Sequence, residues 1–510
     1  MADDNTLVEI DNLYVNFYTY QGVVKAIDGI DLEIKNGETL GIVGETGCGK
    51  SVTASTIMKL ILSPPGKIES GAIYFMEPPD VRAARKQAEL DAQTWYENLP
   101  PGERAKVVAE YGMRFTGFKK DRKALRSDGT VMPVPNRIPT GVLAAHFRKK
   151  LEKVPKDDKV MQEAIGQKYD LLPKSNEYMQ LIRGRFISMI FQEPTAALNP
   201  VFTAGDQIAE VILQHRKSDM AKRARLAVYR EQWLTETGRI KKTLIRKGKM
   251  IDKKLDGQDP PAGWKPKQTY RTRMLDMIEK NPHTLGNIMD RIPLVRRIPY
   301  FNQHNKDIYN QGIIEATRML DIVRIPDPEG VVNRYPYELS GGMQQRVMIA
   351  MALACNPKLL IADEPTTALD VTIQAQILKL MRELKETYGS SILLITHNLG
   401  VVAEMCDRVG VMYAGSMAEI GASRTIFKKP LHPYTKGLMS AVPSVQKDTD
   451  TLFTIRGSVP NLVKPPPGCR FHPRCDYAKE FCKKVKPGLK EIEPGHMVAC
   501  HMVTGAKGYE

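Results

Sequence analysis

The sequence reads Gly44-Glu45-Thr46-Gly47-Cys48-Gly49-Lys50-Ser51 directly after the apolar run Thr39-Leu-Gly-Ile-Val43. This G-x-x-x-x-G-K-[ST] pattern, between a predicted strand and a predicted helix at 51–62, is typical of a loop that surrounds nucleotide phosphates. The glycines let backbone N–H groups approach the phosphates, and the helix N-terminus adds its positive dipole end. We expect Lys50 to reach the β- and γ-phosphates and Ser51 to ligate Mg²⁺. We expect the residues from Gly44 to Val52 to contact ATP. The alternative is a tight glycine turn that binds no ligand.

Acidic side chains follow a second apolar strand. Leu359 to Ala362 has a buried-strand pattern and leads into Asp363 and Glu364. Doubly wound sheets bind ligands at such strand ends, so we expect Asp363 to hold Mg²⁺ through its water shell and Glu364 to polarise the attacking water. His397 follows the next strand pattern and is expected to hydrogen-bond the γ-phosphate. A solvated Asp-Glu turn and a structural histidine are the alternatives.

Strand and helix patterns alternate along the chain, which predicts an α/β fold with a mostly parallel sheet. Strand patterns lie at 7–17, 23–34, 39–43, 68–75, 186–191, 358–362 and 391–395, and further helical patterns lie at 312–323, 342–354, 372–388 and 399–406. Two loose, charged stretches interrupt the rhythm, and we interpret them as insertions with helices of their own. No internal repeat is found, which indicates one ATPase domain.

These patterns predict six segments. They are the N-terminal part of the ATPase core at 1–75, an insertion at 76–180, a segment with a glutamine loop at 181–215, a basic insertion at 216–311, the rest of the core at 312–430 and a cysteine-rich extension at 431–510.

Bulk composition excludes several classes of protein. At 42% hydrophobic and 26% charged residues the chain is ordinary for a globular protein, which excludes low-complexity disorder as its main character. No apolar run approaches the roughly 18 residues of a membrane helix. The first ten residues, MADDNTLVEI, lack the apolar region of a signal peptide. We expect the protein to stay in the cytoplasm, and any peripheral role at the cytoplasmic face of the membrane needs a partner that spans the bilayer.

The net charge of +16 is concentrated in one stretch. Residues 216–310 hold about 23 Lys and Arg against about 10 Asp and Glu, so they contribute roughly +13. Such a patch suits anionic lipid headgroups, an acidic protein or nucleic acid. A solvated helical surface is the alternative.

Several motifs around these residues resemble those of ABC ATPases. Leu339-Ser340-Gly341-Gly342-Met343-Gln-Gln resembles the LSGGQ signature, with Met in place of the first Gln. Gln192 resembles the Q-loop glutamine that touches Mg²⁺ and the water. Ala368-Leu-Asp370 resembles the D-loop, and Thr396-His-Asn398 the H-loop. Tyr20 resembles the aromatic residue that stacks on adenine, with Tyr18 or Phe17 as weaker candidates and strand packing as the alternative.

The resemblance implies an ABC-type P-loop NTPase core, with a RecA-like sheet, an antiparallel β subdomain and a helical signature subdomain. It also implies that Ser340, Gly341 and Gly342 cover the phosphate of an ATP held by a second, similar ATPase subunit, in a heterodimer. Two membrane-spanning permease subunits and an extracytoplasmic solute-binding protein would complete the assembly.

Further motifs resemble the oligopeptide/dipeptide importer branch of that family. They are Gly41 to Ser51, Met189-Ile-Phe-Gln-Glu-Pro194, Ala197-Leu-Asn-Pro200, Tyr337 to Met343 and His432-Pro-Tyr-Thr435. The resemblance implies an ATPase that powers uptake of di- and oligopeptides. An importer of nickel or oligosaccharides, and a soluble ABC-type ATPase acting on nucleic acid, are the alternatives. Nucleic acid is the less expected partner because neither insertion carries heptads and only one ATPase domain is found.

Four cysteines crowd the C-terminal tail: Cys469, Cys475, Cys482 and Cys500. A cytosolic chain should not need disulfides, so the cluster points first to a metal. The family resemblance implies a [4Fe–4S] cluster. Structural zinc, with His472 or His501 as substitute ligands, and no metal at all are the alternatives.

Overall fold

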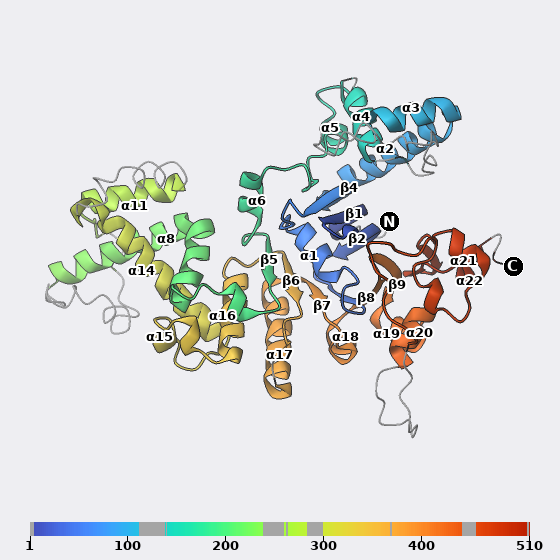
Figure 1. Ribbon diagram of the computed structural model, residues 1–510. Coiled ribbons are helices and arrows are strands. Elements are labelled where there is room, and N and C mark those ends of the chain that lie inside the picture. Colours follow the sequence, from blue (N-terminus) through green and yellow to red (C-terminus); the bar gives the residue numbers. More distant parts are fainter. Residues whose placement is uncertain are drawn as a thin grey trace. The chain divides into compact units, whose positions relative to one another are not determined.

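The computed structural model describes residues 5–111, 138, 140–152, 154–237, 260–261, 264–282, 299–367, 370–440, 455–506 and 509 (Figure 1). The chain forms two compact units. The first comprises residues 1–183, 358–367 and 381–510, and the second comprises 184–357 and 368–380. The expected D-loop residues 368 and 369 lie outside the described residues.

The first unit begins with a three-stranded antiparallel sheet in the order β2-β1-β4. Its strands are β1 (Thr6–Thr19), β2 (Gly22–Lys35) and β4 (Gly66–Phe75). Along β1 the buried residues change from Val8 and Ile10 to Leu13 and Val15. The change follows a bulge at Asn12, whose φ is 46°, because one extra residue moves the alternation by one position. The bulge therefore keeps both halves of the strand facing the core.

A larger sheet of the first unit runs in the order β10-β11-β9-β8-β3-β7-β6. Its parallel centre is formed by β3 (Thr39–Val43), β6 (Leu359–Asp363), β7 (Ser391–Ile395) and β8 (Arg408–Tyr413). Every residue of β3, β6 and β7 is buried, as continuous apolar runs predict for parallel strands covered on both faces. The expected α/β sheet with a parallel centre is confirmed, but its β10-β11-β9-β8 side is antiparallel, so the sheet is mixed. The phosphate-binding loop follows its strand β3.

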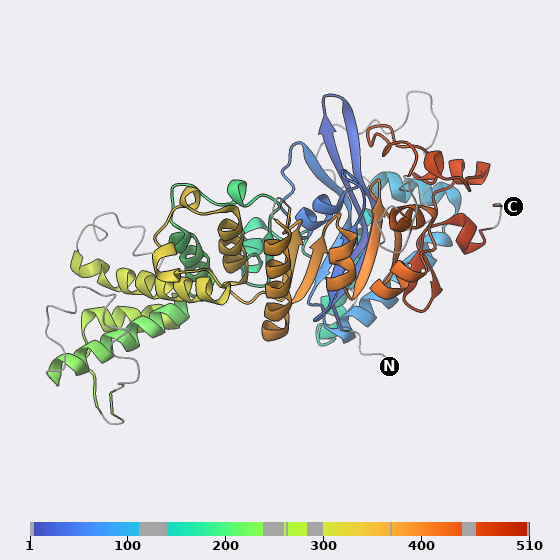
Figure 2. The same ribbon diagram turned by 90° about the horizontal axis from the view of Figure 1, so that it is seen from below.

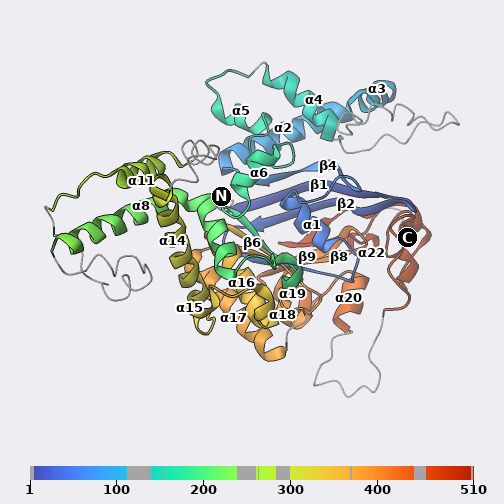
Figure 3. The ribbon, with the colours of Figure 1, turned by 60° about the vertical axis from the view of Figure 1, so that its left-hand side comes forward.

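Helices of the first unit follow the sheet strands, lie in the first expected insertion or lie in the C-terminal extension (Figure 3). They are α1 (Lys50–Ile57), α2 (Pro79–Glu97), α3 (Pro101–Tyr111), α4 (Thr140–Leu151), α5 (Lys159–Ile165), α6 (Asn176–Ile182), α18 (Leu399–Met405), α19 (Ser423–Lys428), α20 (Pro433–Ser440), α21 (Glu480–Lys484) and α22 (His501–Thr504). Helices α2, α4 and α5 share a small apolar core that includes Tyr96, Val142, Phe147 and Ile165. This part of the chain thus has a core of its own.

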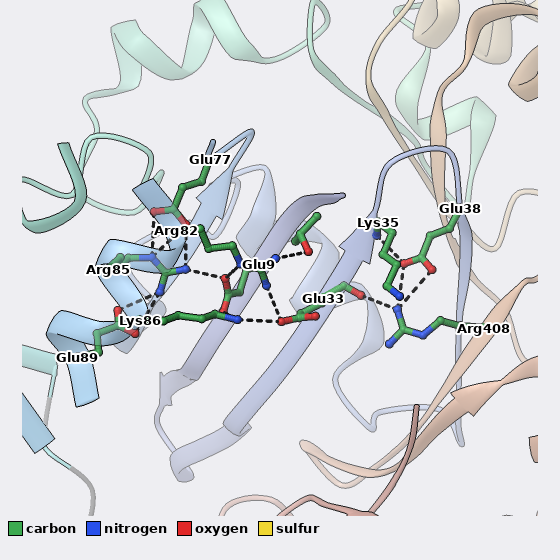
Figure 4. Close-up of polar contacts among 11 residues, drawn as sticks. Glu9, Glu33, Lys35, Glu38, Glu77, Arg82, Arg85, Lys86, Glu89 and Arg408 are labelled. Atoms are coloured by element: carbon green, nitrogen blue, oxygen red, sulfur yellow. Dashed lines mark hydrogen bonds and ion pairs between the residues drawn. The ribbon is translucent and has the colours of Figure 1, made fainter. Parts of the chain in front are cut away.

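A buried network of ion pairs joins α2 to the three-stranded sheet (Figure 4). Arg85, 1% exposed, bonds Glu9 of β1, Glu77 before the helix and Glu89 one turn later. Its guanidinium also lies 3.6 Å from the ring centroid of Tyr74 in β4. Arg82, one turn earlier, bonds Glu9 and Glu33 of the sheet. Paired in this way, buried charges hold α2 at a fixed register on the sheet.

The tail adds strands to the edge of the larger sheet. Strand β11 (His496–Val498) pairs antiparallel with β9 (Ser416–Ala422), and β10 (Lys490–Glu493) pairs with β11. The fully buried carboxylate of Glu419 accepts bonds from the backbone N–H groups of Leu431 and His432. It also lies 2.7 Å from Nε2 of His496. These bonds fix the tail to the sheet, an arrangement that short, polar strands do not reveal in the sequence.

The second unit is mainly helical (Figure 2). It contains β5 (Ile187–Ile190), α7 (Pro194–Ala197), α8 (Ala204–Glu236), α11 (Tyr270–Lys280), α14 (Pro299–Ile322), α15 (Pro328–Val331), α16 (Gly341–Leu353) and the first part of α17 (Val371–Tyr388). Helices α8, α11 and α14 pack side by side. Helix α8 continues past residue 216, where the sequence predicts a segment boundary, with only a local departure from helical geometry at Arg216.

Across the part of the chain that the structure describes, no helix combines the length and apolar character of a membrane span.

Candidate functional site

The phosphate-binding loop joins β3 to α1 through backbone conformations that suit glycine. Gly44 and Gly49 have φ of 156° and 103°. A Cβ on Gly44 would lie 2.1 Å from the carbonyl oxygen of Met412, and one on Gly49 would lie 2.7 Å from that of Ala26. Both positions therefore exclude any side chain, for steric and conformational reasons. The loop is held against the β8–β9 turn, where Gly415 N–H donates to the Cys48 carbonyl oxygen at 2.8 Å.

Lys50 is buried at the start of α1 with its ammonium turned into the loop. Nζ donates to the carbonyl oxygens of Gly44 at 2.8 Å and Glu45 at 3.2 Å. A cation held by loop carbonyls beside a helix N-terminus is placed to bind a phosphate oxygen. The thiol of Cys48 is fully buried, and burial raises its pKa, so it is a small filler in the loop and no nucleophile.

Ser51 and Asp363 come together from elements 312 residues apart in the sequence. The Ser51 hydroxyl donates to Asp363 Oδ1 at 3.0 Å. Burial raises the pKa of Asp363, the Ser51 hydrogen bond opposes that shift, and the Glu364 charge adds to it. A desolvated carboxylate beside a hydroxyl and a second acid suits a hard cation such as Mg²⁺, which would stabilise the ionised form.

The side chain of Glu364 turns away from that of Asp363 because the backbone of Glu364 is left-handed, with φ of 48°. Oε1 lies 3.1 Å from His397 Nδ1, and Oε2 accepts a bond from Thr367 Oγ1 at 3.0 Å. Its N–H also donates to the carbonyl oxygen of Ile395 at the end of β7. Lys50, Ser51, Asp363, Glu364 and His397 thus belong to one unit, at the carboxyl ends of β3, β6 and β7.

Tyr20 lies in the β1–β2 turn with its ring fully exposed. Tyr18 is tied down instead: its hydroxyl donates to Glu69 at 2.5 Å, and Lys67 lies 5.7 Å from its ring centroid. Phe17 is half-buried within β1. Tyr20 is therefore the one of these three whose ring is most open to stacking on a base, and the adenine contact stays a prediction.

The remaining expected residues lie in the second unit, each at an element end. Gln192 is exposed between β5 and α7. Ser340 caps α16, accepting from Met343 N–H at 3.4 Å, and a Cβ added at Gly341 would meet no atom within 4 Å. Asp370 caps α17 by accepting from Ile373 N–H at 2.9 Å. A 13-residue helix that begins at an open Ser-Gly-Gly corner can present its N-terminal N–H groups to an anion.

The tail reaches the phosphate-binding loop, which sequence reasoning missed. Arg474 Nη1 lies 3.1 Å and 3.0 Å from the two carboxylate oxygens of Glu45. The backbone N–H of Glu45 donates to the Tyr434 hydroxyl at 3.0 Å. The only sequence signal was His432-Pro-Tyr434-Thr, which resembles the importer family but sits 389 residues from its target.

The tail cysteines correct the expectation of an iron–sulfur cluster. Cys469, Cys475, Cys482 and Cys500 line one small apolar cavity. Burial raises the pKa of Cys469 to about 12 and of Cys475 to about 11, so both thiols are neutral in the chain as described. Among the described residues, no group of three or more His, Cys, Asp or Glu side chains is placed to hold a metal ion. The predicted [4Fe–4S] cluster and the zinc alternative are wrong.

Other contacts hold the tail together without a metal. The rings of Tyr413, Tyr434 and Phe471 cluster at centroid distances of 4.6, 5.1 and 5.4 Å. Arg470, 6% exposed, pairs with Asp28 of β2 at 3.1 Å. Aromatic packing and a buried ion pair thus supply the cohesion that a metal was expected to give.

Many basic side chains of the second expected insertion are ion-paired in the described ranges. Arg216 and Arg223 both bond Glu315 of α14, and Arg225 bonds Glu279 of α11. Arg271 bonds Asp307 at 2.5 Å. These pairs join α8, α11 and α14 and leave those guanidiniums less available to an anionic partner. Residues 238–259 and 283–298, which carry further basic side chains, lie outside the described residues.

Two family models and several known proteins match the sequence of this chain. A family model described as "ABC transporter" matches residues 27–166 and 144–367, and one described as "Oligopeptide/dipeptide transporter, C-terminal region" matches 418–482. The dipeptide transport ATP-binding protein DppD of Bacillus subtilis is 34% identical, covering 97% of this chain and 94% of the relative. The oligopeptide transport ATP-binding proteins AppD of B. subtilis and OppD of Salmonella typhimurium are 32% and 30% identical, covering 98% and 97% of this chain and 97% and 93% of the relatives.

Proposed function

The chain belongs to the ATP-binding proteins of oligopeptide/dipeptide ABC transporters, and we propose that it hydrolyses ATP to power the uptake of di- and oligopeptides across the cell membrane. Its fold is an ABC ATPase cassette with a mixed α/β sheet. The observation that supports the activity is the hydrogen bond from Ser51 to Asp363 at 3.0 Å, next to Lys50. Glu364, directly after β6, pairs with His397, which follows β7.

The site residues take the following roles. Mg²⁺, when bound, neutralises charge on the phosphates and aligns them for attack. Ser51 and Asp363 would hold that ion, with Gln192 as a further ligand, while Lys50 and the loop N–H groups would bind the phosphates. Glu364 orients the attacking water and accepts its proton, and His397 steadies the Glu364 carboxylate and the γ-phosphate. Tyr20 stacks on the adenine ring.

The assembly around the chain follows from the family. The motor contains a second ATPase subunit, whose ATP is covered by Ser340, Gly341 and Gly342, and Asp370 lies in the same dimer contact. The loop at Gln192 meets two permease subunits, and a solute-binding protein delivers the peptide. The chain then sits at the cytoplasmic face of the membrane through its permeases. Within this proposal the antiparallel sheet, the parallel sheet and the α8–α16 helices are the three subdomains of the cassette.

Reconstitution of the purified complex in proteoliposomes tests this function. We expect peptide-loaded binding protein to stimulate ATP hydrolysis and ATP-dependent accumulation of labelled peptide, with neither seen in Lys50→Ala. Nickel and an oligosaccharide serve as parallel cargoes, and transport of either one in place of peptide would refute the peptide assignment. Hydrolysis by Lys50→Ala at the wild-type rate would refute the site.

A further inference from the structure

The tail and the phosphate-binding loop share a set of contacts that the ATPase chemistry alone does not require. We propose that Arg474, together with Tyr434, is a positioning residue for nucleotide binding: it neutralises Glu45 and fixes the loop, so the C-terminal extension sets the affinity for ATP. The proposal rests on the ATPase function above and concerns the same site.

The loop contains an acid where a polyanion must bind. Glu45 is the second residue of the phosphate-binding loop, and its carbonyl oxygen accepts a bond from Lys50 Nζ. A carboxylate so close to the triphosphate opposes binding through like-charge repulsion, which desolvation strengthens. A cation that pairs with Glu45 and does not itself occupy the phosphate position removes this repulsion.

Arg474 meets both conditions. Its side chain is 7% exposed, and Nη1 reaches both carboxylate oxygens of Glu45. Its other donors are committed elsewhere: Nε bonds the carbonyl oxygen of Arg456 at 2.8 Å, and Nη2 bonds that of Gly457 at 3.2 Å. The planar fork is therefore fixed on three sides, and lysine could not reproduce that geometry.

Tyr434 binds Glu45 through the backbone N–H of Glu45. The ring is fully buried, and its hydroxyl accepts the Glu45 N–H. Its own N–H donates to Nδ1 of His432, whose pKa burial lowers to about 4, so this imidazole is neutral and able to accept. The His432 N–H in turn donates to Glu419 Oε2. A chain of bonds thus runs from the tail strands through His432-Pro-Tyr434 to the loop.

The test is carried out on the full chain in its assembled transporter, with KM and kcat for ATP hydrolysis and the Kd of a fluorescent ATP analogue. Arg474→Gln should raise KM and Kd about tenfold, because Glu45 is left unpaired, while kcat changes less than about twofold. Adding Glu45→Gln to it should bring both values back to within about threefold of wild type. Arg474→Lys should fall between, and Tyr434→Phe, which removes only the hydroxyl, should raise KM about threefold.

Lys429→Gln is the matched control, because Lys429 pairs with Glu493 of the tail without touching the loop. It should leave KM unchanged. An unaltered KM in Arg474→Gln would overturn the proposal, as would a raised KM that Glu45→Gln fails to rescue, since that pattern means the tail has merely lost its fold. Lys50→Ala distinguishes failure of this proposal from failure of the proposed ATPase function. If Lys50→Ala abolishes nucleotide binding while Arg474→Gln has no effect, the ATPase site stands and only the role of the tail is refuted.

Discussion

At the scale of single residues, two consecutive acids, Asp363 and Glu364, reach different partners because their backbone conformations differ. Asp363 ends β6 in extended geometry and faces Ser51. Glu364 takes a left-handed φ of 48°, which costs on the order of 1 kcal/mol for a non-glycine residue and turns its carboxylate to His397. The bond from Glu364 N–H to Ile395 holds that conformation in place.

Glu364→Gln should bind ATP with nearly wild-type affinity but hydrolyse it about 10²–10³-fold more slowly, because an amide cannot accept the proton of the attacking water. Phosphate release and equilibrium nucleotide binding measure the two effects separately. Glu404→Gln, a change at an exposed acid paired with Arg382, is the control and should hydrolyse normally. Normal turnover in Glu364→Gln would remove the role we assign to this residue.

Site residues that belong to a short sequence motif could be predicted. Site residues whose partner comes from a distant part of the chain could not. The spacing from Gly44 to Ser51 and the Asp-Glu pair after an apolar strand carry their chemistry in the sequence. Arg474 gives no such signal, because its partner Glu45 lies 429 residues away. Clustered cysteines misled because spacing shows only that Cys469 and Cys475 are close along the chain, whereas no group of three or more ligand side chains among the described residues is placed to hold a metal ion.

At the scale of elements, two buried arginines, Arg82 and Arg85, position α2 on the antiparallel sheet, and Arg85 pairs with the larger number of acids. Arg85 pairs with Glu9, Glu77 and Glu89 together, and burial raises the pKa of Glu77 even though the Arg85 hydrogen bond and charge lower it. Removing one buried partner of such a network leaves charges uncompensated, a larger loss than removing an exposed pair.

Arg85→Met should therefore lower the free energy of unfolding by about 3–5 kcal/mol. Lys86→Met alters the neighbouring, half-exposed cation of the same network and should cost no more than about 1 kcal/mol. Urea denaturation followed by tryptophan fluorescence reports the change, since Trp95 lies in α2 itself. Equal midpoints for the two variants would show that Arg85 is not the anchor.

Asp170 is a second buried anchor of the insertion at 76–180, and its carboxyl group titrates. Asp170 is 4% exposed and accepts the N–H groups of Ile73 and Leu172, and burial raises its pKa to about 6. The folded state therefore holds this proton more tightly than the unfolded state, whose pKa is about 3.9. Stability from this group is full below pH ~4 and falls as pH rises to ~6, by at most about 3 kcal/mol.

Asp170→Asn keeps the acceptor oxygen and cannot ionise, so it should remove that slope. Urea midpoints of the two proteins at pH 4.5, 5.5 and 6.5 make the comparison, and groups that titrate equally in both cancel. Parallel curves for wild type and variant across this range would contradict the assignment.

Element prediction from sequence worked best where apolar runs are long. The strands at β3, β6 and β7 and the helix α16 were expected nearly at their observed bounds, because continuous burial leaves a clear pattern. The sequence predicts a segment boundary at 216, where a basic stretch begins, yet α8 runs through that position and its arginines pair with Glu279 and Glu315 on neighbouring helices. Tertiary ion pairs of this kind cannot be seen in a single segment.

At the scale of the whole molecule, the two sets of residues that we propose for binding ATP lie in different units of the chain. Lys50 and Glu364 belong to the first unit, and Ser340 at the start of α16 belongs to the second. In the dimer we propose, each unit serves a different nucleotide, so a change at Ser340 should spare ATP binding by its own chain and affect turnover at the shared site.

Ser340→Arg should keep the Kd for ATP within about twofold and lower hydrolysis by the assembled transporter at least about tenfold, because a long cation at the helix start displaces the phosphate contact. Ser340→Ala is the matched variant: it removes only the cap bond to Met343, at a cost of about 1 kcal/mol, and should retain most of the turnover. Equal activity of the two variants would argue against a shared nucleotide.

The pairing of β11 with β9 has a consequence for the behaviour of the protein in solution. Without the tail, β9 would expose a row of unsatisfied backbone groups flanked by buried apolar residues, a ready template for another chain. The tail replaces that border with β10, whose Lys490, Glu491 and Glu493 put charges of both signs at the outermost position. A variant that lacks β10 and β11 would then expose the β9 edge and should aggregate more readily than the full chain.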